Sequence, residues 1–410
     1  MQFIILITDS IPAANGGGIS QTLFNLLDGW ESPIWFVNRP GEKPVDGPVI
    51  KAQIVKYRFE RLRHFGKRVL RRLNPAISKI NFNRQEGLKE LPAGLPTPRE
   101  AFVLVSTTEP IKLHFAWVLQ KKFGYTVVPY FMDDWMAGCK LKWKGNDIQR
   151  VVGDMLRQAN CRMMISQNLD QILTLRYQLQ ARPTLVVHNP APALSREVDK
   201  FPSSEVLKGG LRTIIYAGSI WPMHFDALKT VAKAVGIRQA QAANSQASQP
   251  AFELIIYTSD AAWQHNRKSL EGPGVIYGGF IPYAGMQAEL AKGWLLLVTA
   301  SFEVRYAPFT NSSVQTKLTD YMAAGKPVLF VGPAEGASGQ FVHDWDCGFS
   351  IGTTNPADIA AQLEAIAALP QLSERKGQNG LAAASGYFSK PVVQERLYSF
   401  LERCVCLPAQ

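Results

Sequence analysis

A chain of 410 residues is longer than one hydrophobic core usually holds, so it predicts two domains. Hydrophobic residues make up 46% of the sequence and charged residues 19%, which excludes a disordered or collagen-like chain. No apolar run approaches the roughly 18–20 residues that a membrane-spanning helix needs.

The opening run FIILI leads directly into Thr8 and Asp9, so we expect a first strand rather than a signal peptide. The five cysteines lack the spacing of a metal site, and we expect reduced thiols in a cytosolic protein: Cys139, Cys161, Cys347, Cys404 and Cys406.

The N-terminal half alternates strand-like and helix-like segments. A glycine run, Gly16–Gly18, separates the first strand from the first helix. The expected strands are 3–8, 33–37, 102–106, 126–131, 161–166 and 184–187, and the expected helices are 19–30, 112–123, 146–159 and 168–179. This alternation predicts an open parallel sheet with right-handed crossovers.

The net charge of +11 is concentrated in segment 56–73. Eight basic residues stand there against the single acid Glu60: Lys56, Arg58, Arg61, Arg63, Lys67, Arg68, Arg71 and Arg72. An apolar stripe at helical spacing accompanies them: Leu62, Phe65, Val69 and Leu73. One interpretation is an amphipathic helix packed on its own domain. The other is a helix that binds an anionic membrane surface. No nucleic-acid-binding module accompanies the segment, so we expect no nucleic acid partner.

The strand and helix pattern pauses after His188-Asn189-Pro190 and then restarts. We expect an N-terminal domain over 1–190, a linker over 191–210, a second domain over 211–388, and a C-terminal helix over 389–410 that returns to the first domain. The second domain predicts strands within 213–219, 252–259, 275–280, 294–300, 328–332 and 347–352. Its expected helices are 224–236, 283–292, 317–324 and 336–344, with further helices after the last strand, and its expected loops include 240–250 and 301–313. Ligands of such sheets bind outside the carboxyl ends of the strands, which here places the expected site in an interdomain cleft.

The stretch KLTDYMAAGKPVLFV, from Lys317 to Val331, carries charges that core packing does not explain. Apolar residues recur at helical spacing, Gly325 is a natural helix end, and VLFV predicts a buried strand. Lys317 and Asp320 lie on nearly one face of this helix. They form either a surface ion pair at i,i+3 or part of a binding site.

The order of these pieces resembles a GT-B-fold glycosyltransferase of the bacterial surface-polysaccharide, group 1-like type. The resemblance rests on the glycine-rich loop after the first strand, HNP before the linker, YAGS opening the second half, and KLTDYMAAGKPV. It implies an α/β fold of two Rossmann-like domains and a nucleoside-diphosphate-sugar donor.

For the donor, the resemblance implies that an acid at the position of Asp320 binds the ribose hydroxyls. Residues before the helix would offer backbone N–H groups to the diphosphate: Ser312, Ser313 and Gln315. Lys317 in the first turn would supply positive charge. Gly17 and Gly18 resemble the loop that touches donor phosphate or acceptor, or they form only a tight turn.

The sequence departs from the retaining relatives at two places. Ser312 stands where many of them have Glu, and Trp221, Met223 and His224 stand where they often have Arg and Lys. His224 is therefore a candidate donor-binding residue.

Asp133 and Asp134 directly follow a predicted buried strand, where catalytic groups gather. Some inverting relatives show a similar Asp-Asp pair, which implies Asp133 as the base, its pKa raised by Asp134, with Asp134 orienting it or the acceptor. The alternative is that both acids cap the following helix. Glu109, Arg305 and Tyr306 are candidates for the acceptor or sugar pocket, and Glu109 alternatively begins a helix before Pro110.

Together these patterns predict a metal-independent, inverting hexosyltransferase-type enzyme that acts on a saccharide acceptor, in particular a lipid-linked one. We expect it in the cytoplasm, held at the inner face of the membrane through 56–73. A nucleotide-sugar 2-epimerase of the same fold is a second hypothesis, which the lack of clustered histidines disfavours. A non-catalytic scaffold with this fold is a third.

Overall fold

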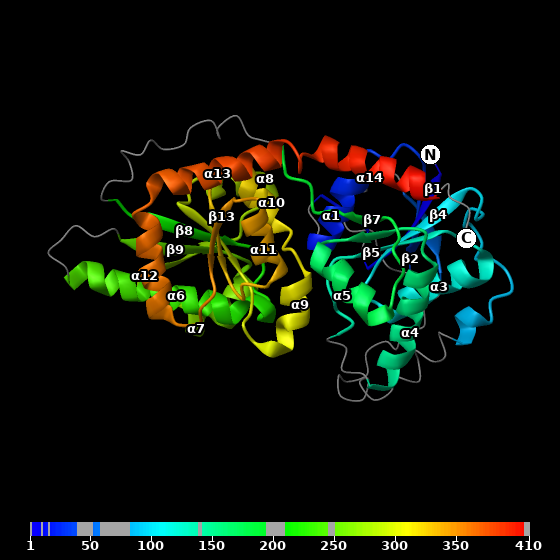
Figure 1. The fold of residues 1–410 in the computed structure, drawn as a ribbon, viewed down its shortest axis with the longest axis horizontal. Helices are drawn as coiled ribbons and strands as arrows, with labels where there is room; N and C mark the ends of the chain where they lie inside the picture. Colours follow the sequence, from blue (N-terminus) through cyan, green and yellow to red (C-terminus); the bar gives the residue numbers. More distant parts are fainter. Residues whose placement is uncertain are drawn as a thin grey trace. The chain divides into compact units, whose positions relative to one another are not determined.

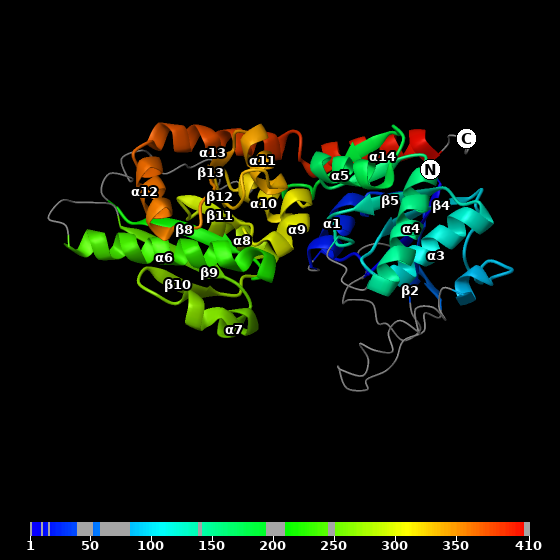
Figure 2. The ribbon, with the colours of Figure 1, turned by 60° about the horizontal axis from the view of Figure 1, so that its bottom comes forward.

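The computed structural model describes residues 2–9, 11–14, 17–38, 52–57, 83–137, 142–193, 210–244 and 251–405. The chain divides into two compact units. Unit 1 holds Met1–Val187 together with Gln394–Gln410, and unit 2 holds His188–Val393. Each unit is a parallel sheet covered by helices on both faces (Figures 1 and 2).

Unit 1 contains a seven-stranded sheet with the order β3-β2-β1-β4-β5-β6-β7, and every pairing between its strands is parallel. The strands are β1 (Phe3–Thr8), β2 (Ile34–Asn38), β3 (Ala52–Lys56), β4 (Ala101–Ser106), β5 (Val127–Phe131), β6 (Arg162–Met164) and β7 (Thr184–Val186). The helices are α1 (Gly18–Leu27), α3 (Pro110–Phe123), α4 (Lys142–Gln158), α5 (Gln167–Tyr177) and the larger part of α14 (Lys390–Val405). The strand order reverses between β1 and β4, so ligands are expected at their carboxyl ends.

The C-terminal helix α14 packs on α1 within unit 1. The side-chain amide of Gln394 donates to the Asn25 carbonyl at 2.9 Å. The Tyr398 hydroxyl donates to the Leu26 carbonyl at 3.0 Å, and its ring meets Trp30 edge to face with centroids 5.1 Å apart. Most of α14 is therefore part of unit 1, although it follows unit 2 in the sequence.

Unit 2 contains a six-stranded parallel sheet with the order β10-β9-β8-β11-β12-β13. The strands are β8 (Arg212–Ala217), β9 (Phe252–Tyr257), β10 (Val275–Gly279), β11 (Leu295–Thr299), β12 (Val328–Val331) and β13 (Gly348–Ile351). The helices are α6 (Pro222–Asn244), α7 (Asp260–Leu270), α8 (Tyr283–Leu290), the short 3-10 helix η1 (Val304–Tyr306), α9 (Ala307–Ser312), α10 (Lys317–Ala323), α11 (Ala337–Asp344), α12 (Pro356–Ala367) and α13 (Pro370–Ser385). The order reverses between β8 and β11.

The core of unit 2 follows from its continuous apolar strands. All five residues of β11 and all four of β12 are buried. Aliphatic side chains of α6 and α12 pack against one face of this sheet. The predicted two Rossmann-like sheets are therefore confirmed.

Four elements differ from the expectation. Strand β3 lies between the expected strands 33–37 and 102–106, where we predicted no strand, and α6 extends to Asn244 through part of the expected loop 240–250. Helix α7 was missed, although its N-cap Ser259 accepts a hydrogen bond from the Ala262 amide. Helix α9 occupies a stretch that we expected to be a loop. Helix α9 has only six residues, and tertiary packing decides the structure of such segments more than local pattern does.

Several expectations lie outside the described residues. These include 58–73, which is nearly all of the basic segment, and 194–209 of the expected linker. Among the helices that the structure describes, none has the length and apolar character needed to cross a bilayer.

Candidate active site

In unit 2, polar side chains gather at the carboxyl ends of β8 and β11, where the strand order reverses. Gly218 and His224 follow β8, Thr299 ends β11, and α10 begins at Lys317. Parallel α/β sheets bind ligands at this position.

Helix α10 is fixed to the end of β8 by Tyr321. Its phenolic oxygen accepts a hydrogen bond from the Ala217 amide at 2.9 Å, and its hydroxyl donates to the Ala217 carbonyl at 3.2 Å. Gly325 follows the helix with a φ of 67°, a left-handed conformation that favours glycine. The predicted helix end and the buried strand after it are confirmed.

Lys317 carries a buried ammonium group. Its Nζ lies 4.0 Å from the centre of the Tyr216 ring and has no hydrogen-bond partner among the described residues. Gly218, with a φ of 132°, leaves room for this group, because a Cβ there would lie 3.2 Å from Nζ. Burial lowers the pKa of Lys317 to about 7, and the nearby Asp320 opposes that shift. The interpretation of Lys317 and Asp320 as a surface ion pair is therefore wrong.

Asp320 lies beside α8. The Tyr283 hydroxyl donates to Asp320 Oδ1 at 3.0 Å, and the Gln287 side-chain amide donates to the Asp320 carbonyl at 3.1 Å. Burial raises the pKa of Asp320 to about 7, while the Tyr283 hydrogen bond and the charge of Lys317 lower it. The structure thus brings together the two charged residues that the sequence singled out.

His224 is held as a neutral side chain. Its Nδ1 lies 2.8 Å from the Thr299 carbonyl, which can only accept, so Nδ1 carries a hydrogen and Nε2 is left as an acceptor. Burial and the nearby Lys317 lower the pKa of His224 to about 3. His224 therefore cannot replace a missing positive charge, but its Nε2 can accept a hydrogen bond from a hydroxyl group.

Gln315 completes this edge. Its side-chain amide donates to the same Thr299 carbonyl at 2.8 Å. Buried polar atoms of three residues lack a partner within the described part of the chain: Gln315 Oε1, Thr299 Oγ1 and Lys317 Nζ. Unpaired buried polar groups each cost about 1–3 kcal/mol, so a polar ligand or water at this edge would be stabilising.

The segment before α10 differs from the expected stretch of free amides. Ser312 belongs to α9, and its hydroxyl donates to the Pro308 carbonyl at 2.5 Å. Ser313 follows α9, and its amide donates to the Phe309 carbonyl. The Gln315 amide donates to Ser338 Oγ at 3.1 Å. The amides of Ser313 and Gln315 are therefore already paired.

Arg305 and Tyr306 lie in η1 rather than in an open loop. Arg305 is exposed and pairs with Glu303, with 2.6 Å between Nε and Oε2. Its guanidinium also lies 4.7 Å from the centre of the Tyr306 ring. These two residues thus form a surface pair.

In unit 1, acidic and hydroxyl side chains meet at the carboxyl ends of β1, β4 and β5. Asp9, directly after β1, accepts hydrogen bonds from the hydroxyls of Thr107 and Thr108, the latter at 2.9 Å, and from the Thr108 amide at 2.9 Å. Asp133 follows β5 and accepts from the Trp135 amide at 3.2 Å. Burial raises the pKa of Asp133 to about 6, with smaller contributions from the charges of Asp134 and Asp9. Desolvation, more than the neighbouring acid, perturbs this carboxyl.

Asp134 has a different environment from Asp133. It is buried, and both its oxygens accept from the Arg176 guanidinium, one of them at 2.6 Å. This bidentate pair occupies the carboxylate. The two adjacent acids therefore have different surroundings: Asp134 is paired with Arg176, whereas Asp133 lies at the sheet edge with a raised pKa.

Three further candidates lie near this edge. Glu109 is the N-cap residue of α3, without a side-chain cap bond, and its amide donates to Thr107 Oγ1 at 3.0 Å. Gly17 is the N-cap of α1 with a φ of −68°, and a Cβ there would meet nothing within 4 Å. Gly18 is exposed. The conformation of Gly17 does not require glycine, and both glycines leave this helix start open.

Sequence reasoning missed Asp9, Tyr283 and Arg176 as members of these two sites. A polar residue directly after the first strand of the sheet was a signal for Asp9. Tyr283 and Arg176 contact their acids over 37 and 42 residues of chain, a pairing that no local pattern encodes. In the part of the chain that the structure describes, no three His, Cys, Asp or Glu side chains gather as a metal site.

Neither a protein-family model nor a curated protein sequence matches this chain. Several solved structures, in contrast, are similar to this chain in fold. Anabaena HepE in complex with UDP is similar with a TM-score of 0.64 and 14% identity, covering 98% of this chain and 100% of that one. The sucrose-phosphate synthase of Thermosynechococcus elongatus has a TM-score of 0.64 and 15% identity, covering 98% and 99%. A UDP-forming trehalose-phosphate synthase of Burkholderia vietnamiensis has a TM-score of 0.67 and 11% identity, covering 99% and 98%. The chain has the fold of these proteins, the GT-B architecture of two Rossmann-like domains.

Proposed function

We propose that this protein is a glycosyltransferase that uses a nucleoside-diphosphate-sugar donor. The observation that carries the proposal is the buried ammonium of Lys317 beside Asp320, which has no hydrogen-bond partner within the described part of the chain. A buried cation without a partner is costly, and a diphosphate at the edge of β8 and β11 supplies the missing anion. HepE was solved with UDP and with UDP-glucose, which makes uridine nucleotides the first donors to test.

In this proposal the residues of unit 2 bind different parts of the donor. Asp320 accepts hydrogen bonds from the ribose hydroxyls, and Lys317 contacts the diphosphate. His224 accepts a hydrogen bond from a donor hydroxyl through Nε2, because its Nδ1 is committed to Thr299. Gln315 and the backbone around Ser312 and Ser313 border the diphosphate.

Transfer also needs a base for the acceptor hydroxyl, and Asp133 has the required properties. A carboxyl with a pKa of about 6 is ionised at neutral pH yet remains basic enough to take a proton. Asp134 and Arg176 hold the backbone that presents Asp133. A carboxylate base of this kind corresponds to an inverting hexosyltransferase. Glu109, Arg305 and Tyr306 are candidate acceptor or sugar contacts, and Gly17 and Gly18 are candidate donor contacts.

We propose further that transfer needs no metal ion, since Lys317 balances the charge of the leaving diphosphate. Activity that is unchanged by EDTA is the expected result. Loss of activity in EDTA with recovery in Mg²⁺ or Mn²⁺ would contradict this part of the proposal without affecting the nucleotide site.

We also propose a saccharide acceptor, in particular a lipid-linked one in surface polysaccharide biosynthesis, reached from the cytoplasmic face of the membrane. The basic segment 56–73 supports this through its charge and apolar stripe. Wild-type protein should sediment with anionic vesicles in a salt-sensitive way. The binding should disappear when five arginines become glutamine: Arg61, Arg63, Arg68, Arg71 and Arg72. Equal sedimentation of both proteins would refute the membrane role.

Calorimetric titration with UDP, GDP and TDP tests the central proposal. At least one nucleotide should bind wild-type protein, and Lys317→Met should weaken it at least tenfold, whereas the surface variant Lys233→Met should not. Hydrolysis of the matching nucleotide sugar then separates an enzyme from a binding scaffold, and the absence of 2-epimer product separates transfer from epimerisation. If none of the three nucleotides binds, the proposed function is wrong.

A further inference from the structure

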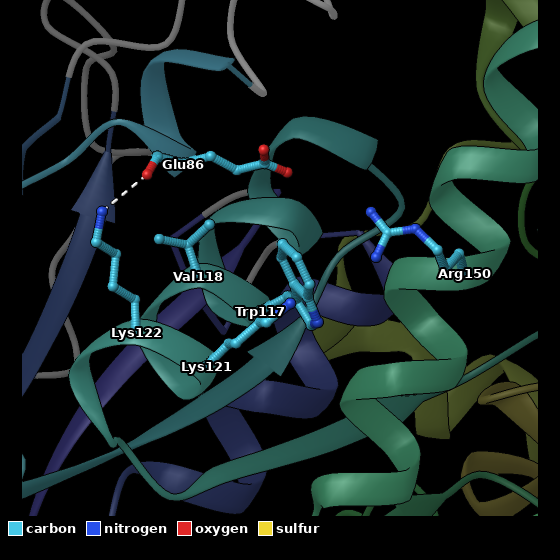
Figure 3. A pocket seen from close by; sticks show the side chains of 6 residues that line it. All are labelled: Glu86, Trp117, Val118, Lys121, Lys122 and Arg150. Atoms are coloured by element: carbon cyan, nitrogen blue, oxygen red, sulfur yellow. Dashed lines mark hydrogen bonds between the residues drawn. The ribbon is translucent and has the colours of Figure 1, made fainter.

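A pocket in unit 1 is lined by side chains of α3, of α4 and of the segment that holds Glu86 (Figure 3). Its volume is about 440 Å³, within the range of small-molecule sites. The residues that line it are Glu86, Trp117, Val118, Lys121, Lys122 and Arg150. Helix α3 runs back along the sheet between β4 and β5, so its last turn, with Lys121 and Lys122, lies toward the end of the sheet opposite Asp9 and Asp133. The pocket is therefore separate from the candidate active site.

The lining of this pocket is cationic. Three basic side chains face a single acid, Glu86, which also contacts His114 Nε2 at 3.2 Å. Lys122 donates one hydrogen bond to the Glu86 carbonyl at 2.8 Å and retains two further ammonium hydrogens (Figure 3). Arg150 contacts Asp154 through NH1 at 3.2 Å and retains its other donors. The pocket thus offers several charged donors to an anion.

Trp117 holds two of these cations in place. Lys121 Nζ lies 4.7 Å and Arg150 Cζ 5.2 Å from the centre of the indole ring, within the range of cation–π attraction. The indole is only 4% exposed, and its Nε1 has no hydrogen-bond partner among the described residues. A buried indole N–H without an acceptor is an incomplete polar group, which indicates a missing acceptor.

We propose that this pocket is a second binding site, for a hydrophilic anion that bears a phosphate or carboxylate group. Charged donors and one aromatic residue suit such a ligand better than an apolar one, and the volume has room for a sugar that carries the anionic group. The group can belong to a soluble acidic saccharide or to a lipid head group. This site is distinct from the proposed nucleotide site and does not depend on it.

Calorimetric titration with inorganic phosphate and with glucuronate tests the site in the full chain. All proteins carry Lys317→Met, so that binding at that ammonium does not add to the signal. Lys121→Gln/Arg150→Gln removes two pocket cations, and Lys233→Gln/Lys268→Gln removes the same charge from exposed positions on α6 and α7. Trp117→Phe keeps a ring but removes the N–H. Melting temperatures establish that each variant is folded.

We expect the Lys317→Met parent and the surface double variant to bind the probes alike, and the pocket double variant to bind at least tenfold more weakly. Binding by Trp117→Phe should be intermediate. Sedimentation with phosphatidylglycerol vesicles then separates the two sources: a loss confined to the pocket variant identifies a lipid head group, and unchanged sedimentation identifies a soluble ligand. Absence of binding by the parent, or equal affinity of both double variants, overturns the proposal.

Discussion

Nucleotide binding should depend on pH through Lys317. The ammonium has a pKa of about 7 without a ligand because it is buried. A diphosphate would return this pKa toward 10.5, the ordinary value for lysine, because the anion stabilises the charged form. The free protein must then take up a proton to bind above pH 7, and the affinity must fall as the pH rises.

The size of the effect follows from the protonated fraction. With a pKa of about 7, roughly 9% of Lys317 is charged at pH 8 and roughly 1% at pH 9, so the affinity should fall about tenfold, or about 1.4 kcal/mol. The neighbouring groups do not disturb this window. Asp320, with a pKa of about 7, is already ionised above pH 8, and His224, with a pKa of about 3, is neutral throughout.

Isothermal titration with UDP at pH 8 and 9, in two buffers of different ionisation enthalpy, measures both the affinity and the proton uptake. About 0.9 proton per nucleotide is expected at pH 8. Lys317→Arg is the matched control, since arginine stays charged and should remove both effects. The same tenfold loss in Lys317→Arg, or an affinity that is constant between pH 8 and 9 in wild-type protein, would refute the reasoning.

Four further predictions follow from the two sites. Asp320→Ala should weaken nucleotide binding by about 1–3 kcal/mol by calorimetry, because ribose hydroxyls lose their acceptor; an unchanged affinity would remove this residue from the site. Asp133→Asn should lower kcat about 10²–10⁴-fold with little change in nucleotide affinity, and wild-type kcat/KM should fall as the pH drops through about 6, where the base becomes protonated. Arg176→Leu should lower the free energy of unfolding in urea by about 3–5 kcal/mol, because it removes the bidentate guanidinium partner of the buried Asp134 carboxylate, and a loss below 1 kcal/mol would contradict this. Gly218→Ala should lower the free energy of unfolding by about 1–3 kcal/mol, because its φ of 132° strains any residue other than glycine, and it should also weaken nucleotide binding. Gly124→Ala, at a φ of 75° in the other unit, is the control: it should lower stability without weakening nucleotide binding.

The sequence predicted those parts of the fold that short-range patterns encode. The continuous apolar strands, the helix from Lys317 and its end at Gly325 all depend on residues within a few positions of one another. Helices α7 and α9 were missed because their apolar residues are few and their packing partners are distant in the chain.

The candidate sites divide in the same way. Lys317 and Asp320 were found because they sit on one helical face with no structural reason for charge. The raised pKa of Asp133 was expected from Asp134, yet burial is its main cause, and the burial of a side chain depends on the whole fold. The sequence pattern could not indicate Arg176, because its role depends on a contact with Asp134, 42 residues away in the chain.

The pair of hydrogen bonds between Tyr321 and Ala217 has a consequence for the kinetics of ligand binding. One phenol both accepts from and donates to the last residue of β8, and these two hydrogen bonds fix α10 to the strand end. Lys317 and Asp320 are therefore already aligned before a ligand arrives, and little conformational entropy is lost at this edge when it does. Association with unit 2 alone should then be limited by diffusion and orientation of the incoming molecule rather than by a slow rearrangement of the protein.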